Sequence, residues 1–393
     1  MRSSSMVNPL NPAAYSLTPR QGFLFDFGVE GVNFYNRQQK YADGAQTTSR
    51  TSYNTFNFHD IAFQLPLARR LGLGFSLTPY SSVGYRVSAD EQSDDVWGNI
   101  GRVQYLYAGE GDLTEVKLGI GWEVVKRVSI GVAAQYYWGD IERTYQTVVS
   151  NNIVNGGSVN TVTGTDSYGI SRIKMQLGLQ ADLIQSERQV LTLGATYDMG
   201  GNLRPSVNQT VVNGDIYGTV VRGDTTRMAL KLPVQLGVGL YYQNAKIAAG
   251  VDYIYQNWEN NESPKSVPGA VNVAYKNTNT VKLGFEYTPN RMDIRNYLKR
   301  WSYRVGFRYG TYYQTFEGKT LSQYAVTAGF GMPVRFLGRS SIDFGVEFGQ
   351  RGNDSPLRID NRQIGLVRQR YVKFSLGLTL FGEDSWFVRY KYD

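Results

Sequence analysis

The sequence predicts an all-β protein, a transmembrane antiparallel β-barrel of about fourteen strands. The first observation behind this prediction is that residues 227–242 alternate apolar with polar or small side chains without interruption. Strand side chains switch faces at every residue, so we expect one strand whose apolar face carries Leu232, Val234 and Leu236. It exceeds the roughly 5–6 residues usual for strands in soluble proteins, whereas about 9–11 tilted residues cross a bilayer. The apolar face is therefore expected to contact lipid.

The second observation is a composition rich in aromatic residues but polar on average. The 393 residues include 29 Tyr, 18 Phe and 6 Trp, and the mean hydropathy is −0.35. No run of apolar residues is long enough for a transmembrane helix, so none is expected. A β-barrel is compatible with this hydropathy, because its lumen-facing side chains dilute the apolar signal.

The third observation is that long and short connections alternate along the chain. Strands are predicted at 21–37, 49–66, 71–89, 98–125, 128–149, 164–183, 188–204, 224–242, 245–259, 271–288, 300–316, 320–333, 339–351 and 363–381. Long polar connections cover 38–48, 90–97, 150–163, 205–223, 260–270 and 352–362, and short ones cover 67–70, 126–127, 184–187, 243–244 and 334–338. Outer-membrane barrels have long extracellular loops and short periplasmic turns, so the alternation supports the barrel. Two connections fit less well, because 289–299 is long for a turn and 317–319 is short for a loop.

An even number of strands requires that 98–125 is a single crossing, although Gly109, Gly111 and Asp112 interrupt its pattern. We interpret the break at 109–113 as a kink or bulge within one strand, because paired glycines relieve the steric cost of unusual backbone dihedrals. An ordinary Gly-Asp turn between two short strands is the alternative.

Two pieces are predicted to lie outside the barrel wall, which covers 21–381. Residues 1–20 contain the prolines Pro9 and Pro12, and proline lacks the N–H that a strand ladder needs. Residues 382–393 end the chain with alternating aromatic side chains, as an extension of the last strand or as a tail.

Composition also limits the function classes. The chain has no Cys, which excludes disulfides and thiolate metal sites, and its single His59 excludes multi-histidine metal sites. The formal net charge of +8 is spread along the strands rather than gathered in one arm, so nucleic acid is not an expected partner. No catalytic constellation or phosphate-binding motif is present. We therefore expect no enzymatic activity and no cofactor.

The start of the chain, M-R-S-S-S-M, has no apolar segment of the kind found in signal peptides. The predicted barrel would lie in the outer membrane, where lipid is its expected partner. Outer-membrane proteins are exported with such a signal. We therefore expect the numbering to begin after the removed signal, or with a Met that replaces it.

The alternation also predicts which charged side chains point into the lumen. The inward bases include Arg102, Arg172, Lys174, Arg227, Lys231, Arg304 and Arg308, and inward acids include Asp26, Glu30, Asp182, Asp198, Asp252, Glu286, Asp343 and Glu347. Buried charges persist when they are paired, so one interpretation is a lumen closed by cross-strand ion pairs. The other is that some bases bind the carboxylate of an amphipathic ligand, because Arg forks suit carboxylates. The side chains predicted to point inward are mainly polar, which argues against long-chain fatty acids as ligands.

Five short segments of the sequence are distinctive: N-P-A-A-Y-S (11–16), G-F-L-F-D-F-G-V (22–29), L-T-P-Y-S-S-V-G-Y (77–85), G-E-G-D-L-T-E-V-K-L-G (109–119) and W-F-V-R-Y-K-Y-D (386–393). They resemble segments of the FadL-type outer-membrane transport proteins, particularly their Bacteroidota branch. They follow the family order over the whole chain. Asp112-Leu113 departs from the small residue that many relatives carry there, which weakens any statement about a ligand.

The resemblance implies a fourteen-stranded barrel with an N-terminal hatch in its lumen and a strand kink that forms a lateral opening. By position, the hatch would include Asn8, Pro9, Asn11, Pro12 and Ala13, and the kink would include Gly109, Gly111 and Asp112. For Asn11-Pro12-Ala13, a turn that merely tethers the N-terminus is the alternative.

The leading function hypothesis is the passage of small hydrophobic or amphipathic molecules across the outer membrane without chemistry. The alternative is a non-transporting accessory barrel within a larger outer-membrane complex for assembly or export, with other outer-membrane proteins as partners. An open polar porin is the third hypothesis, and the hatch-like N-terminus and the charged lumen disfavour it.

Overall fold

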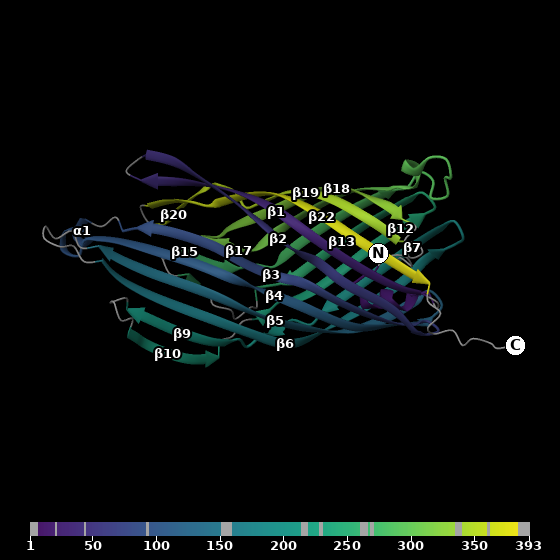
Figure 1. Cartoon of the computed structure of the whole chain (residues 1–393), viewed down its shortest axis with the longest axis horizontal. Helices are drawn as coiled ribbons and strands as arrows, with labels where there is room; N and C mark the ends of the chain where they lie inside the picture. The colour runs from purple at the N-terminus through teal and green to yellow at the C-terminus, as the bar shows by residue number, and fades with distance from the viewer. Residues whose placement is uncertain are drawn as a thin grey trace.

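The barrel wall is a closed antiparallel sheet, as the sequence predicts, with fourteen wall strands. The computed structural model describes residues 7–19, 22–42, 45–91, 94–150, 159–213, 219–227, 231–259, 266–267, 271–334, 340–359 and 362–383. The first strand, β1 (Gly22–Ala42), pairs with β2 (Ala45–Ala68) on one side and with the last strand, β22 (Val367–Glu383), on the other. This pairing closes the ring (Figure 1).

The other wall strands follow in chain order, each paired with its neighbour. They are β3 (Leu71–Asp90), β4 (Arg102–Val125), β5 (Val128–Ser150), β6 (Val159–Gln185), β7 (Gln189–Asp198), β12 (Val234–Asn244), β13 (Ile247–Asn257), β16 (Thr278–Tyr287), β17 (Ser302–Phe316), β18 (Lys319–Val334) and β19 (Ser340–Arg351). Shorter strands accompany them: β8 (Gly201–Asn202), β9 (Ser206–Asn213), β10 (Thr219–Arg227), β11 (Lys231–Leu232), β14 (Ser266–Val267), β15 (Val271–Tyr275), β20 (Pro356–Ile359) and β21 (Arg362–Gly365). No helix among these described residues is long and apolar enough to cross a membrane.

The outer face of the wall is apolar, because every second side chain points away from the lumen. Leu177 and Leu179 of β6, and Leu283 and Phe285 of β16, are between 41% and 48% exposed. Their immediate neighbours Gln176 and Gln180 are at most 4% exposed. A soluble protein would bury these leucines, so the outer face is the surface that contacts lipid.

The two ends of the barrel differ in their connections. At one end, here called the turn end, strands join through short turns such as 69–70, 126–127 and 245–246. The connection 289–301 also lies there and contains the short helix η2 (Tyr297–Arg300). At the opposite end, the loop end, the helix α1 (Asp94–Asn99) joins β3 to β4.

The wall is much taller than a membrane at the loop end. β2, β4, β5 and β6 contain 24, 24, 23 and 27 residues, whereas about 9–11 tilted residues cross a bilayer. Figure 1 shows these strands projecting toward α1, with the β9–β10 hairpin beside them. About half of each strand therefore stands outside the hydrocarbon.

The prediction of one continuous strand over residues 227–242 is wrong. Residues up to Arg227 belong to β10, which pairs with β9, whereas the barrel strand β12 starts only at Val234. Between them, Lys231 and Leu232 pair with Asn202 and Gly201 in a separate two-stranded sheet. Pro233 lacks the N–H that a continuous ladder requires, which explains the interruption.

The alternation predicted that Leu232 shares the lipid-facing side of Leu236, and this prediction is wrong. It packs against Leu203 and the inner cluster described below. The neighbouring strand is interrupted in the same way: β7 ends at Asp198, and the next long strand, β9, begins only at Ser206. Residues 199–205 and 231–233 therefore leave the wall at matching positions.

Other predicted connections turn out to contain strand. β1 and β2 extend through most of 38–48, β9 and part of β10 lie within 205–223, and β20, which pairs with β21, lies within 352–362. Polar residues pair well in a sheet that stands in water, so their polarity does not distinguish such strands from loops. Gly382 and Glu383 belong to β22, and the remaining C-terminal residues lie outside the described part.

Candidate functional site

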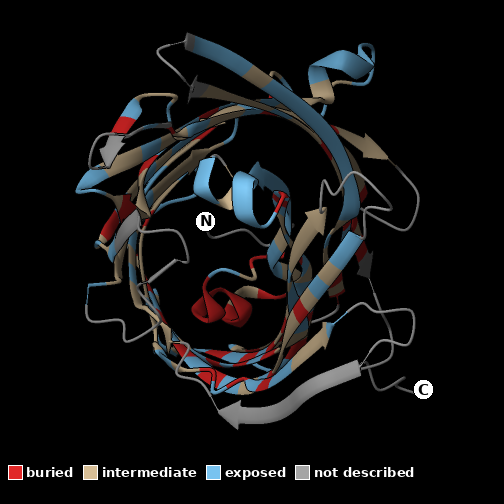
Figure 2. Cartoon of the chain, turned by 90° about the vertical axis from the view of Figure 1, so that its left-hand side faces the viewer, coloured by how far each residue is buried: buried red, intermediate tan, exposed pale blue. Residues whose placement is uncertain are grey.

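The N-terminal segment, residues 7–19, lies inside the ring of strands, where Figure 2 shows its short helix against one side of the wall. This helix, η1 (Pro12–Leu17), begins after Asn11, whose Oδ1 accepts a hydrogen bond from the backbone N of Ala13 at 3.0 Å. Proline is favourable at the first helical position, because its missing N–H would have no partner there. The sequence therefore forms a compact turn of helix that fits within the barrel.

Hydrogen bonds join this segment to several wall strands. Asn11 Nδ2 donates to the carbonyl oxygens of Leu179 and Ala195, both at 3.2 Å. Ser16 Oγ donates to Ser129 Oγ at 2.8 Å, and Lys117 Nζ donates to the Pro9 carbonyl at 3.0 Å. These contacts reach β4, β5, β6 and β7, so the segment is bound along one side of the lumen.

Glycines on the inner face make room for the segment. A Cβ at Gly131 would stand 2.3 Å from the Pro12 carbonyl carbon, and one at Gly178 would stand 2.2 Å from Asn11 Oδ1. Gly72 and Gly121 contact the backbone of the helix in the same way. Only glycine permits so close an approach of two backbones.

The hatch residues named from the sequence fall within this contact. Asn8, Asn11 and Ala13 are 7%, 6% and 0% exposed, and Asn8 Oδ1 accepts a hydrogen bond from the Leu10 amide. Sequence reasoning missed Tyr15, which is 1% exposed and has the largest buried side chain of the helix. Burial raises the pKa of its hydroxyl, and the nearby charge of Glu115 acts in the same direction.

The break at 109–113 lies inside one continuous strand, β4, and not in a turn between two short strands. The register between β4 and β5 passes from Gly111↔Ile141 to Thr114↔Trp138 and leaves two residues unpaired on each strand. Gly111 has φ +120° and Gly139, on β5, has φ +151°. A Cβ at Gly111 would lie 2.1 Å from the Asp140 carbonyl oxygen, so the two glycines allow the strands to cross closely here.

An apolar cluster covers the inner side of this break. It consists of Leu113, Tyr137, Ile170 and Leu203, each at most 4% exposed, with Ile141 and Leu232 packed against it. Tyr80 adds an edge-to-face contact, with its ring centroid 4.8 Å from that of Tyr137. We call these residues the inner cluster.

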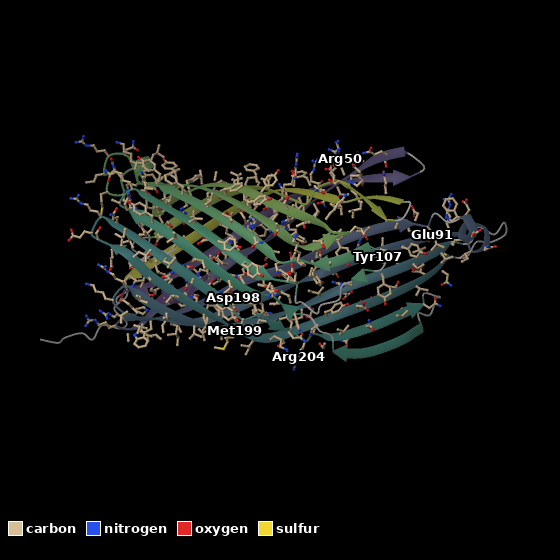
Figure 3. The ribbon with its side chains drawn as sticks, turned by 180° about the vertical axis from the view of Figure 1, so that it is seen from behind. Arg50, Glu91, Tyr107, Asp198, Met199 and Arg204 are labelled. Atoms are coloured by element: carbon tan, nitrogen blue, oxygen red, sulfur yellow. The ribbon has the colours of Figure 1, made fainter. Side chains whose placement is uncertain are left out.

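Two of the predicted lumenal bases hold the residues that leave the wall near the inner cluster. Arg172 Nε donates to the Leu203 carbonyl at 3.1 Å, and Lys174 Nζ donates to the Gly201 carbonyl at 2.7 Å. Figure 3 shows Asp198, Met199 and Arg204 at this interruption. The sequence did not predict this arrangement, because the inward turn at 199–205 has no alternation of its own.

Arg304 and Arg308 line the opposite side of the lumen, where they form ion pairs between strands. Arg304 Nε lies 2.8 Å from Glu286 Oε2 and a further Arg304 nitrogen contacts Asp343. Arg308 Nη2 lies 2.7 Å from Glu347 Oε1. Similar pairs elsewhere in the lumen join Lys373 to Glu30 at 2.9 Å and Lys117 to Glu115 at 3.3 Å.

The remaining predicted bases lie elsewhere. Arg102 is exposed at the first residue of β4, at the loop end, and Val103 next to it is buried. Lys231 belongs to the small sheet of β8 and β11. Arg227 ends β10, and its side chain is outside the described part of the structure.

A cavity of about 570 Å³ remains between the N-terminal segment and the ion-paired wall. Its charged lining includes Asp26, Asp60, Asp252, Lys282, Glu286, Arg304 and Asp343. Carboxylates outnumber cationic groups in this lining, so the charged part of the cavity is acidic, and apolar residues such as Val7 also line it. No group of His, Asp or Glu residues in the described ranges is arranged to hold a metal ion.

Solved structures share this architecture at low sequence identity. A FadL homologue of Pseudomonas aeruginosa has a TM-score of 0.62 and 13% identity, over 94% of this chain and 92% of that one. The toluene transporter TodX of P. putida gives 0.60 and 15%, over 95% and 92%. The toluene transporter TbuX of Ralstonia pickettii gives 0.53 and 14%, over 96% and 95%. At these identities the likeness shows the fold, which is that of a FadL-like outer-membrane barrel.

No curated protein matches the chain. The model of the BamG family matches residues 1–393, the full length of the sequence. The chain therefore belongs to the BamG family.

Proposed function

We propose that this protein is a non-transporting barrel subunit of a larger outer-membrane protein complex, anchored by its wall and docked to partners through the sheet at the loop end. The observation that carries the proposal is the closed wall at the break in β4. Leu113 and Tyr137, at 4% exposure each, pack across its inner side, where a lateral route would have to begin.

The outer side of the break supports the same proposal. Outward positions there carry charged or polar side chains, such as Glu110, Asp112 and Glu142, whereas Leu118 and Ile120 farther along β4 are apolar. Charged side chains are costly in hydrocarbon, so the break stands at or above the membrane boundary. An opening at this height would lead to water rather than into the lipid.

The tall sheet at the loop end supplies a surface for partners. Tyr85, Val87 and Tyr107 of β3 and β4 are 44%, 54% and 37% exposed although they lie beyond the lipid-facing band. Figure 3 shows Tyr107 and Glu91 on this projection. Large exposed apolar side chains on a water-facing sheet are typical of protein interaction surfaces.

A FadL-type passage of small amphipathic molecules is the second candidate, and the lumenal cavity of about 570 Å³ is the observation that favours it. Its excess of carboxylates repels carboxylate ligands, which leaves neutral or cationic amphiphiles as candidates. These would have to move past the N-terminal segment, which is hydrogen-bonded to the wall.

Site-specific photocrosslinking in living cells tests the proposal. A photoreactive amino acid at Tyr85 or Tyr107 is expected to crosslink to a defined outer-membrane protein, whereas one at Leu177 on the lipid-facing band is not. In parallel, planar-bilayer recordings of the purified protein should show no conductance, and the variants Leu203→Gly and Leu113→Gly should introduce one. Conductance in the unmodified protein, or uptake of an amphiphile without any crosslink at the loop end, would favour the second candidate.

A further inference from the structure

Four arginines gather on the outer surface of the barrel near the loop end. Arg37 of β1 lies directly opposite Arg368 of β22 on one side and Arg50 of β2 on the other. Arg370, two residues along β22 from Arg368, faces the same way. Figure 3 shows Arg50 on the projecting part of β2. We call these four residues the arginine cluster.

The cluster points outward, toward the level at which lipid headgroups lie. On β22, Phe374 and Leu376 share the face of Arg370 and are 45% and 51% exposed. Tyr35, directly opposite Arg370 on β1, is also half exposed. An outward face that passes from apolar side chains through tyrosine to arginine marks the membrane–water interface.

The charges of the cluster are poorly balanced by the protein. Like charges directly opposite each other on paired strands are destabilising. Within the described residues the cluster forms ion pairs with one carboxylate, that of Asp354, which lies 3.4 Å from Arg37 Nε and 3.7 Å from Arg368 Nη2. Arg37 Nε is nevertheless buried without a hydrogen bond among these residues. An anion from outside the chain would complete this site.

The space between the side chains suits a headgroup of moderate size. A surface cavity of about 400 Å³ is lined by the four arginines together with Tyr35, Asn36, Thr51 and Ser52. Guanidinium groups bind phosphate through paired N–H donors, and Ser52, which lies opposite Tyr35 on the same face, supplies a polar contact for a sugar. The apolar side chains of β22 lie next to the cavity, where acyl chains would be placed.

We propose that the arginine cluster binds the phosphorylated headgroup of a glycolipid in the outer leaflet, with its acyl chains against Phe374 and Leu376. The loop end faces the cell exterior by the usual orientation of such barrels, with long loops outside. Bound lipid would relieve the repulsion between Arg37 and its two arginine neighbours. It would also fix the orientation of the projecting β1–β2 hairpin.

The test uses the full-length protein in mild detergent, with diphosphoryl lipid A as the probe and native mass spectrometry as the readout. The variant Arg50→Gln/Arg370→Gln should bind the probe about thirty-fold more weakly, because each basic residue near an anionic lipid surface strengthens binding several-fold. The control Arg69→Gln/Arg295→Gln removes the same charge from exposed positions at the turn end and should bind as the parent does.

Two further probes separate the possible ligands. A dephosphorylated lipid A should bind both proteins equally weakly, and inorganic phosphate at millimolar concentration should not displace the lipid. Heat-modifiable migration in gels confirms that each variant is a folded barrel. Equal binding of diphosphoryl lipid A by the parent and the cluster variant would overturn the proposal. Tighter binding of inorganic phosphate than of the lipid would overturn it too, because the site would then serve a soluble anion.

Discussion

The ring of Tyr15 occupies the space that a side chain at Gly74 would need. A Cβ at Gly74 would stand 2.2 Å from Tyr15 Cζ and 2.3 Å from Cε1. Two residues earlier on the same inward face, a Cβ at Gly72 would meet the Tyr15 carbonyl oxygen at 1.8 Å. The alternating glycines of β3 and the aromatic residue of the N-terminal helix therefore form one fitted contact.

Gly74→Ala is expected to displace the N-terminal helix while leaving the barrel folded, because a contact of 2.2 Å cannot be accommodated without movement of the ring. The natural absence of Cys allows a direct measurement with the pair Ser16→Cys/Ser129→Cys, whose parent hydroxyl oxygens are 2.8 Å apart. Oxidation should close this disulfide readily in the parent background and with lower yield when Gly74→Ala is added.

Gly284→Ala is the matched control for that experiment, since a Cβ there meets nothing within 4 Å. It should leave the yield of the disulfide unchanged. If the disulfide forms with the same yield in the Gly74→Ala background as in the parent background, the helix is not held by the contact between Tyr15 and Gly74.

Much of the barrel could be predicted from alternation, because the outer face obeys a simple rule. Val238, Leu240 and Leu283 point to lipid, as the alternation of side chains along a strand predicts, and they are 51%, 42% and 48% exposed. The ladder fails where proline and glycine redirect the backbone, as at Gly200 and Pro233. There the side chains turn inward, and alternation no longer predicts the face on which Leu232 lies.

The break in β4 gives a second prediction. Gly111→Ala should destabilise the folded barrel by about 1–3 kcal/mol, because its φ of +120° is unfavourable for any residue with a Cβ. Urea unfolding in detergent, followed by tryptophan fluorescence, measures this change. Gly84→Ala, on the facing strand with open space around its Cβ, should unfold at the parent concentration. Equal midpoints for the two variants would contradict the strained conformation of Gly111.

The connection 289–301 at the turn end has a pH dependence that can be predicted. The Asn296 and Arg295 backbone amides donate to Asp293 Oδ1 at 2.7 Å and 2.9 Å, and these bonds lower the pKa of Asp293 below its usual value of 3.8. A carboxyl whose pKa is lower in the folded state stabilises the turn above its unfolded pKa. That contribution is lost as the pH falls through the folded value.

Nuclear magnetic resonance of the labelled protein in micelles measures this effect. The amide proton shifts of Arg295 and Asn296 should titrate together with a midpoint below 3.8, and Asp293→Asn should remove the titration. A midpoint at or above 3.8 would show that the two amides do not bind the carboxylate in solution.

The inner cluster was not predicted, because its members come from separate contexts. Leu113 and Tyr137 lie on inward positions of β4 and β5, but Leu203 reaches them only because residues 199–205 leave the wall. Alternation assigns a face to each strand position and contains no information about a segment that folds back into the lumen. The carbonyl partners of Arg172 and Lys174 escaped prediction for the same reason.

The pair of carboxylates around Arg304 gives a last prediction. Arg304→Met leaves Glu286 and Asp343 facing each other without their cation, and breaking such a buried pair is strongly destabilising. The expected loss is about 3 kcal/mol, the lower end of the usual range, because the Arg304 side chain is 30% exposed and water screens part of the effect. The triple variant Arg304→Met/Glu286→Gln/Asp343→Asn should recover most of this loss, since neutral amides have no charge left uncompensated. Guanidinium unfolding of the parent, the single and the triple variant measures both steps. A triple variant no more stable than Arg304→Met would show that Arg304 contributes through the packing of its side chain and not through its charge.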